Sequence, residues 1–309
     1  MKKTINVENK RKAISLVDDI IYSKTSNDNG DSVNLYMSML IQNVNVERKI
    51  IVSEKLDTQK QPVILCIPGG GFTHCARNRI LPELQFLAEE GYVIATIDYR
   101  LSSSAKFPAQ IEDVYTAIKY LKDHSNQYNI DEENIGILGR SAGGCLSLMA
   151  GMNMTLDNLG CKYGEEILNI KAACSMYGIT DLPLWMEYEI KNQYFSNAKF
   201  SMETLVGKYV GGTESTILEY ASKASPIQYI NIDMANILIL HGDNDPIVPL
   251  QQSEKFYNKM KKMGMDEKID FYTVSNAGHG SKEFFQNEIK SIMIDYFKKQ
   301  LKVGGKNNE

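Results

Sequence analysis

The sequence predicts an α/β fold with a doubly wound, mostly parallel sheet. Several apolar runs of strand length, such as residues 62–67 and 92–98, contain few polar side chains, as in strands buried on both faces of a parallel sheet. Segments with apolar residues at three-to-four spacing, such as residues 108–121, lie between these runs and indicate helices. Strands that alternate with helices along 309 residues favour a single α/β domain over residues 1–309.

The expected elements follow one another along the chain. The first 18 residues are charged and are predicted as a helical lead-in, and a turn is expected at Asn27–Gly30. Residues 182–235 interrupt the alternation without a clear strand and are predicted to be an inserted cap. The predicted strands are 20–23, 33–41, 50–52, 62–67, 92–98, 135–138, 170–177, 237–240 and 269–274, and the predicted helices are 81–90, 108–121, 142–151, one that follows Pro249, and 284–301.

Composition and charge exclude several function classes. With 43% hydrophobic and 23% charged residues, the chain has the composition of an ordinary globular protein. Its net charge of -4 is spread along the sequence, and no basic run predicts binding to nucleic acid. No apolar segment approaches the roughly 20 residues needed to cross a membrane. Polar residues follow Lys2 and Lys3 where a signal peptide requires an apolar stretch, so we expect a cytoplasmic location.

The five cysteines form no C-x-x-C pair, which makes a metal site or a redox pair unexpected. Cys66, Cys145 and Cys174 lie within apolar runs, where a free thiol behaves as a small apolar side chain. We therefore expect reduced, structural cysteines. A disulfide between Cys161 and Cys174 is an alternative only if the protein is exported.

The most informative segment is residues 134–144, which read N-I-G-I-L-G-R-S-A-G-G. An apolar run ends in a match to G-x-S-x-G around Ser141, the pattern of a sharp strand-to-helix turn that exposes a serine hydroxyl. The flanking glycines allow the strand and the helix to approach closely. Because such a match also recurs by chance, the rest of the chain must supply the other parts of a nucleophilic site.

A serine hydroxyl is a weak nucleophile and needs a positioned base. Of the four histidines, His279 lies in a glycine-containing loop after the last predicted strand, at the sheet edge expected to present Ser141. His241 is expected to shape its own loop, His124 to end a helix, and His74 to border the site. We therefore predict His279 as the base.

The base needs a carboxylate that orients its ring and stabilises its cation. Asp243 and Asp245 both follow the strand predicted at 237–240. Asp245 is further from the strand and precedes Pro246, which favours it as the acid, whereas Asp243 is expected to accept backbone hydrogen bonds in the turn.

A tetrahedral intermediate also needs donors for its oxyanion. The backbone amide of Ala142 follows the nucleophile, and Gly70 and Gly71 lie in a glycine loop after the strand predicted at 62–67. These three amides are the predicted oxyanion donors. The alternatives for the glycines are a simple turn or a phosphate cradle, but neither G-K-[ST] nor G-x-G-x-x-G is present.

In combination, these motifs resemble those of a known family. The chain is similar over residues 60–300 to α/β-hydrolase esterases related to hormone-sensitive lipase, and most similar to the bacterial branch of acetyl-xylan and feruloyl esterase-like proteins. The motifs that carry the resemblance are Pro68–Phe72, Asp98–Leu101, Phe107–Asp113, Gly139–Gly144, Ala224–Pro226 and His241–Pro246. The resemblance implies an α/β-hydrolase fold and a carboxylic ester hydrolase that forms an acyl-enzyme without metal or organic cofactor. Its nucleophile falls on Ser141, its acid on Asp245, its base on His279 and its oxyanion glycines on Gly70 and Gly71, in the triad order typical of that fold.

Two positions depart from the lipase-like pattern. Pro68 replaces the histidine of His-Gly-Gly-Gly, which favours the branch associated with carbohydrate esters, and Cys145 stands where that branch frequently has histidine. Substrate-binding roles are predicted for Phe72, Arg140 and Trp185. Arg140 has an alternative role in pairing with a nearby carboxylate, and aromatic residues of the cap have one in packing.

The leading hypothesis is a cytoplasmic serine carboxylesterase for short acyl esters, including acetyl esters of sugars or oligosaccharides. A peptidase or amidase that uses the same side chains is the second hypothesis. A ligand-binding protein without catalysis is the third, although such proteins typically lose the histidine. The sequence leaves a homo-oligomer open.

Overall fold

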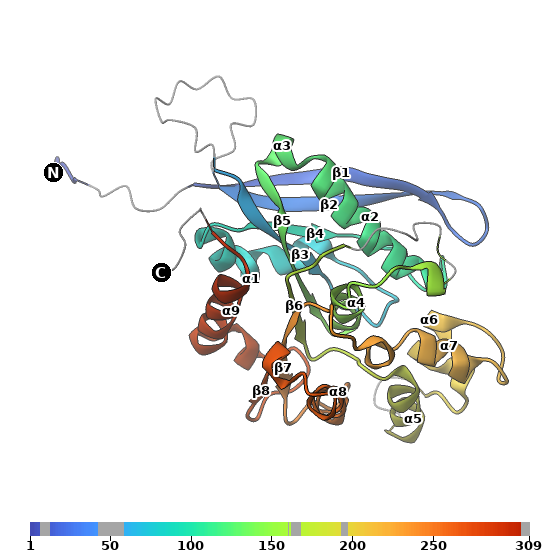
Figure 1. The fold of residues 1–309 in the computed structure, drawn as a ribbon. Helices are drawn as coiled ribbons and strands as arrows, with labels where there is room; N and C mark the ends of the chain where they lie inside the picture. The colour runs from blue at the N-terminus through green and yellow to red at the C-terminus, as the bar shows by residue number, and fades with distance from the viewer. Residues whose placement is uncertain (7–12, 43–58, 160, 162–167, 193–196, 304–309) are drawn as a thin grey trace.

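The computed structural model describes residues 1–6, 13–42, 59–159, 161, 168–192 and 197–303. These residues form one eight-stranded sheet in the order β1-β2-β4-β3-β5-β6-β7-β8 (Figure 1). Strand β2 pairs antiparallel with β1 and β4, and all other neighbouring strands are parallel. The strands are β1 (Ile14–Ser26), β2 (Ser32–Gln42), β3 (Gln61–Ile67), β4 (Val93–Ile97), β5 (Ile130–Arg140), β6 (Ala172–Met176), β7 (Asn236–Gly242) and β8 (Ile269–Val274).

Helices cover both faces of the sheet. Helices α1 (Arg77–Glu89) and α9 (Asn287–Gln300) pack on one face, and α2 (Ala109–Asp123), α4 (Ala142–Gly151) and α8 (Gln251–Lys262) pack on the other. Single turns complete the fold: α3 (Ser125–Tyr128) and the 3₁₀ helices η1 (Asp157–Leu159), η2 (Ser201–Glu203), η3 (Pro226–Tyr229), η4 (Asp266–Lys268) and η5 (Lys282–Phe285).

The central strands are buried on both faces, as their apolar runs predict. In β3, Val63 and Leu65 belong to the core on the α2 and α4 face, whereas Ile64 and Cys66 belong to the core on the α1 and α9 face. All four side chains are inaccessible to solvent. The mostly parallel sheet between two helical layers confirms the predicted fold class.

The prediction of a helical lead-in over residues 1–18 is wrong for its last residues, since β1 already begins at Ile14. Residues 1–6 have no regular structure, and residues 7–12 and the strand predicted at 50–52 lie outside the described residues. The sequence does not indicate this strand because polar residues interrupt its apolar pattern. Asp18 and Asp19 form a bulge, at which Asp19 has a φ of 54°, and both carboxylates contact Arg77. Pairing with β2 therefore overrides the local composition.

The helix predicted over residues 284–301 is interrupted near its start. The short η5 ends at Phe285, Gln286 is extended, and α9 begins only at Asn287. Helix α1 starts earlier than predicted, at Arg77. The other predicted strands and helices are present within a few residues of their expected bounds.

Three helices between β6 and β7 form the insertion at residues 182–235, here called the cap. They are α5 (Leu182–Asn192), α6 (Leu205–Val210) and α7 (Ile217–Lys223) (Figure 1). The described part of the cap contains no strand, as predicted. Its large side chains Trp185 and Tyr209 are almost fully buried, and both belong to the core on the α2 and α4 face. Apolar contacts thus bind the cap to the body of the protein.

All five cysteines are free thiols, so the alternative disulfide between Cys161 and Cys174 is not formed. Four of the five are buried, which fits their predicted structural role. Within the described residues, no helix combines the length and the apolar character needed to span a membrane.

A buried glutamate connects two cap helices. Glu189 on α5 is 3% exposed, and its carboxylate accepts hydrogen bonds from the amides of Leu205 and Val206, at 3.0 and 3.4 Å, where α6 begins. These amides lack acceptors within their own helix. Burial nevertheless raises the pKa of Glu189 to about 7, against smaller opposing effects from the two amides and Lys208.

This raised pKa predicts that the cap loses stability as the pH rises. The folded state binds the Glu189 proton more tightly than the unfolded chain, so stability falls as the pH increases from 4.5 to about 7. We expect Glu189→Gln to remove up to about 3 kcal/mol of this pH dependence. The measurement is thermal unfolding between about pH 4.5 and about pH 8. Glu187→Gln, at an exposed position of the same helix, is the control and should behave as wild type. Equal pH dependence in both variants would contradict the prediction.

Candidate active site

Ser141 lies on a sharp turn between β5 and α4. Its backbone has φ 53° and ψ −120°, a strained conformation for a residue with a side chain. Its amide donates to the Met176 carbonyl at 2.9 Å, which fixes the turn against β6. A Cβ on Gly139 would lie 2.0 Å from the Gly143 oxygen, and one on Gly143 would lie 2.1 Å from the Ile67 oxygen. Both flanking glycines are therefore required sterically, as the motif predicts.

His279 lies beside Ser141 although the two are 138 residues apart. The His279 Nε2 is 2.8 Å from the Ser141 Oγ, and its Nδ1 is 2.7 Å from the Asp245 Oδ2. A proton on Nδ1 suits the carboxylate and leaves Nε2 to accept from the serine hydroxyl, a tautomer that we assign from this network. The structure thus brings together the predicted nucleophile, base and acid.

Asp245 is held by several donors. Its Oδ1 accepts hydrogen bonds from the amides of Ile247 and Val248, both at 2.9 Å, and the residue is 7% exposed. Burial alone would raise the pKa of this carboxyl, but hydrogen bonds from His241, His279 and the Val248 amide together hold the pKa well below its usual range. Asp245 therefore keeps its negative charge next to His279.

The two other predicted residues of this loop have structural partners. His241 is fully buried, with its Nδ1 2.6 Å from the Ser253 Oγ and its Nε2 2.8 Å from the Val248 oxygen. The same Nε2 is 3.5 Å from the Asp245 Oδ2, so His241 also contacts the carboxylate of Asp245. Asp243 accepts a hydrogen bond from the Asn276 amide at 2.6 Å, which ties its turn to the loop of His279.

The glycine loop after β3 passes directly against Ser141. A Cβ on Gly69 would lie 3.1 Å from the Ser141 Cβ, and Gly70 and Gly71 have φ values of 139° and 59° that few other residues adopt. Ala142 is the first residue of α4, where helical amides lack acceptors within the helix. The predicted oxyanion donors therefore occupy neighbouring segments at the serine.

The three predicted substrate-binding side chains have packing partners instead. Phe72 is inaccessible to solvent, and its ring stacks on Tyr209 at 3.8 Å between centroids. Arg140 pairs with Glu83 and lies 5.1 Å from the Phe285 ring centroid, which agrees with the alternative of a carboxylate partner. Trp185 is 1% exposed and donates its indole N–H to the Ile247 oxygen at 2.9 Å. These placements favour structural roles over substrate binding.

Two residues at this site were not predicted from the sequence. The ring of Tyr177 meets that of His279 edge-on at 4.7 Å between centroids, and Leu205 of the cap lies 3.0 Å from where a Gly71 Cβ would be. The position of Tyr177 directly after a strand at the same sheet edge is the signal that indicates it. No comparable signal exists for Leu205. His74 hydrogen-bonds to Thr73 at 2.8 Å, and the described residues contain no cluster of three or more potential metal ligands.

Comparison with known proteins gives the family. The chain matches the BD-FAE family over residues 50–260. It belongs to this family. Among curated relatives, esterase LipC of Mycobacterium tuberculosis is 28% identical over 227 residues, which cover 73% of this chain and 54% of LipC. An acetyl esterase of Salmonella schwarzengrund is 28% identical over 127 residues, or 39% of this chain and 37% of the relative. The chain spans about half the length of LipC and of the other mycobacterial esterases that it matches.

Solved structures share the fold of this BD-FAE member. A truncated carbohydrate esterase from gut microbiota superposes with a TM-score of 0.72 at 24% identity, covering 95% of this chain and 98% of the other. Esterase 2 of Thermogutta terrifontis gives a TM-score of 0.66 at 20% identity, covering 96% and 95%. At these identities the likeness establishes the fold, and it confirms the predicted α/β-hydrolase class.

The tight turn at Ser141 predicts that Gly143→Ala is severely destabilising. Its Cβ would meet the Ile67 and Pro68 carbonyl oxygens, which are backbone atoms that cannot rotate away. We expect a loss of more than about 4 kcal/mol in the free energy of unfolding, measured by denaturant titration. Gly264→Ala is the control, because its Cβ meets nothing within 4 Å and only its φ of 71° is strained, at a cost of about 1 kcal/mol. Similar losses in the two variants would refute the steric explanation.

Proposed function

We propose that this protein is a serine ester hydrolase that works through an acyl-enzyme. The observation that carries the proposal is the continuous hydrogen-bonded path from the Ser141 Oγ through His279 to Asp245, with contacts of 2.8 and 2.7 Å. Each group in that path is the type that nucleophilic acyl transfer requires, and each lies within hydrogen-bond distance of the next.

In the first half-reaction, the Ser141 Oγ attacks the ester carbonyl carbon while His279 Nε2 accepts the hydroxyl proton. The charge of Asp245 stabilises the resulting imidazolium. The amides of Ala142, Gly70 and Gly71 are the candidate donors to the oxyanion, and one such donor typically contributes about 2.7–4 kcal/mol to transition-state stabilisation. The intermediate then breaks its bond to the alcohol oxygen, which takes the proton from His279.

In the second half-reaction, water replaces the alcohol. His279 accepts a proton from the water as its oxygen attacks the acyl carbon, and the same donors stabilise the second oxyanion. Breaking the bond to the Ser141 Oγ returns that proton to the serine and releases the acid. The protein ends each cycle unchanged, and the steps use these side chains, the backbone amides and water.

For the substrate we propose short-chain acyl esters, in particular acetyl esters of sugars or oligosaccharides. Relatives named as acetyl esterase and a structural neighbour named as a carbohydrate esterase support this choice. Pro68 in place of histidine before the glycine loop also favours the carbohydrate-ester branch.

The proposal predicts that Ser141→Ala abolishes ester hydrolysis. We expect a decrease of at least about a thousandfold in kcat, because the nucleophile is lost while the fold is retained. The measurement is initial rates on p-nitrophenyl esters of increasing acyl length, with acetylated xylo-oligosaccharides and an aminoacyl anilide alongside. Acetate release that survives in Ser141→Ala would contradict the mechanism. Faster cleavage of longer acyl esters or of the anilide would contradict the substrate class.

The assignment of the acid can be tested with a matched pair of variants. Asp245→Asn should lower kcat by up to about ten-thousandfold, because a neutral amide neither stabilises the imidazolium nor maintains the tautomer. Asp243→Asn keeps an oxygen that can accept from the Asn276 amide and should retain activity within about threefold of wild type. The measurement is kcat on an aryl acetate for both variants. A larger loss in Asp243→Asn than in Asp245→Asn would reverse the assignment.

A further inference from the structure

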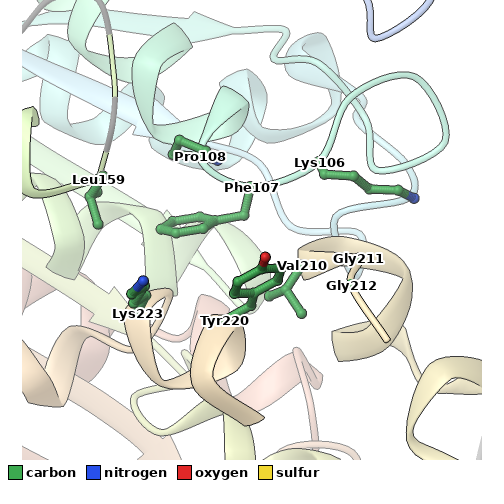
Figure 2. Close-up of a pocket in the computed structure, with 9 residues that line it drawn as sticks. All are labelled: Lys106, Phe107, Pro108, Leu159, Val210, Gly211, Gly212, Tyr220 and Lys223. Atoms are coloured by element: carbon green, nitrogen blue, oxygen red, sulfur yellow. The ribbon is translucent and has the colours of Figure 1, made fainter. Parts of the chain in front are cut away.

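A separate pocket of about 590 Å³ lies between the loop that precedes α2 and the cap (Figure 2). Phe107 and Pro108 line it from that loop, Leu159 from η1, Val210 from the end of α6, and Tyr220 and Lys223 from α7. Its volume is within the range of small-molecule sites, roughly 300–1,000 Å³.

The pocket does not include the residues of the proposed ester hydrolase site. Neither Ser141, His279 nor the glycine loop is among the residues that line it. Two aromatic contacts connect the two regions: the Phe107 ring packs edge-on against Tyr209 at 5.7 Å between centroids, and Tyr209 stacks on Phe72 next to Gly71. The pocket is thus distinct from the serine site yet packed against its supporting side chains.

The lining is apolar with a lysine toward each end. Figure 2 shows the rings of Phe107 and Tyr220 among the residues that line the pocket, with Lys106 and Lys223 toward opposite ends of the group. The Lys106 Nζ already donates to the Ser102 and Lys208 oxygens, both at 2.8 Å. Lys223 is 6.0 Å from the Tyr220 ring centroid and pairs with Glu219 in an exposed contact of 2.7 Å, a type of pair that contributes little. None of the described residues that line the pocket is acidic.

We propose that this pocket binds a small amphipathic carboxylate. Its aryl ring or short acyl chain packs between Phe107 and Tyr220, and its carboxylate replaces that of Glu219 at Lys223. Tyr220 is 38% exposed, so a ligand that covers its ring removes apolar surface from water. The proposal concerns binding alone and does not depend on catalysis by Ser141.

The test is equilibrium binding of phenylbutyrate and, as its uncharged counterpart, phenylbutanol, measured by calorimetry on the full chain. We expect phenylbutyrate to bind at one site per chain. Tyr220→Ala should weaken that binding by about tenfold or more because the ring contact is lost. Leu159→Trp, which narrows the pocket, should also weaken it by about tenfold or more. Leu218→Ala is the matched control, since this residue of α7 is 54% exposed and does not line the pocket.

The charge is tested separately with Lys223→Gln. This variant should bind phenylbutyrate about threefold more weakly and phenylbutanol with unchanged affinity. Equal affinity of the wild type for the two ligands would overturn the carboxylate assignment. Binding that survives both Tyr220→Ala and Leu159→Trp, or that is lost in Leu218→Ala, would overturn the site. Thermal unfolding of each variant shows whether a lost signal reflects the pocket or a failure to fold.

Discussion

The geometry of the site depends on the close approach of three backbone segments that have no side chains between them. Gly139 and Gly143 bring β5 and α4 into contact with each other and with the end of β3, and Gly69 brings the loop after β3 against Ser141. An added methyl group at any of these positions would overlap backbone oxygens. The strained φ of Ser141 persists because this packing determines it from several sides. The same contacts bring the glycine loop and the start of α4 next to the serine.

The negative charge of Asp245 beside His279 depends on burying an ionised carboxylate without leaving it unpaired. An isolated buried carboxylate would take up a proton, because removing its charge from water is costly. Asp245 avoids this with two backbone amides on Oδ1 and two histidines facing Oδ2. Only one of these histidines, His279, reaches the serine. The other, His241, is fixed by Ser253 and Val248 and so helps to hold the Asp245 carboxylate in place.

The sequence predicts the body of the fold well because buried parallel strands have a strong local signature. The apolar runs at residues 62–67 and 237–240 match β3 and β7, and the loops after the strands indicate Ser141, Asp245 and His279. It fails where the structure depends on pairing or side-chain direction. Strand β1 forms through its partner β2 despite polar residues at its bulge. Phe72 and Trp185 are aromatic residues in the right segments, but their rings turn into the core, which spacing alone does not reveal.

The cap is joined to the loops of the site rather than simply placed over them. Trp185 donates to the Ile247 oxygen, two residues after Asp245, and Tyr209 stacks on Phe72 directly after the glycine loop. Leu205 lies against Gly71, and Glu189 holds the amide of that same leucine. A displacement of α5 or α6 would therefore disturb both the loop that contains Asp245 and the predicted oxyanion donors. Because these contacts combine buried apolar packing with hydrogen bonds, the cap and the sheet edge form one packed unit.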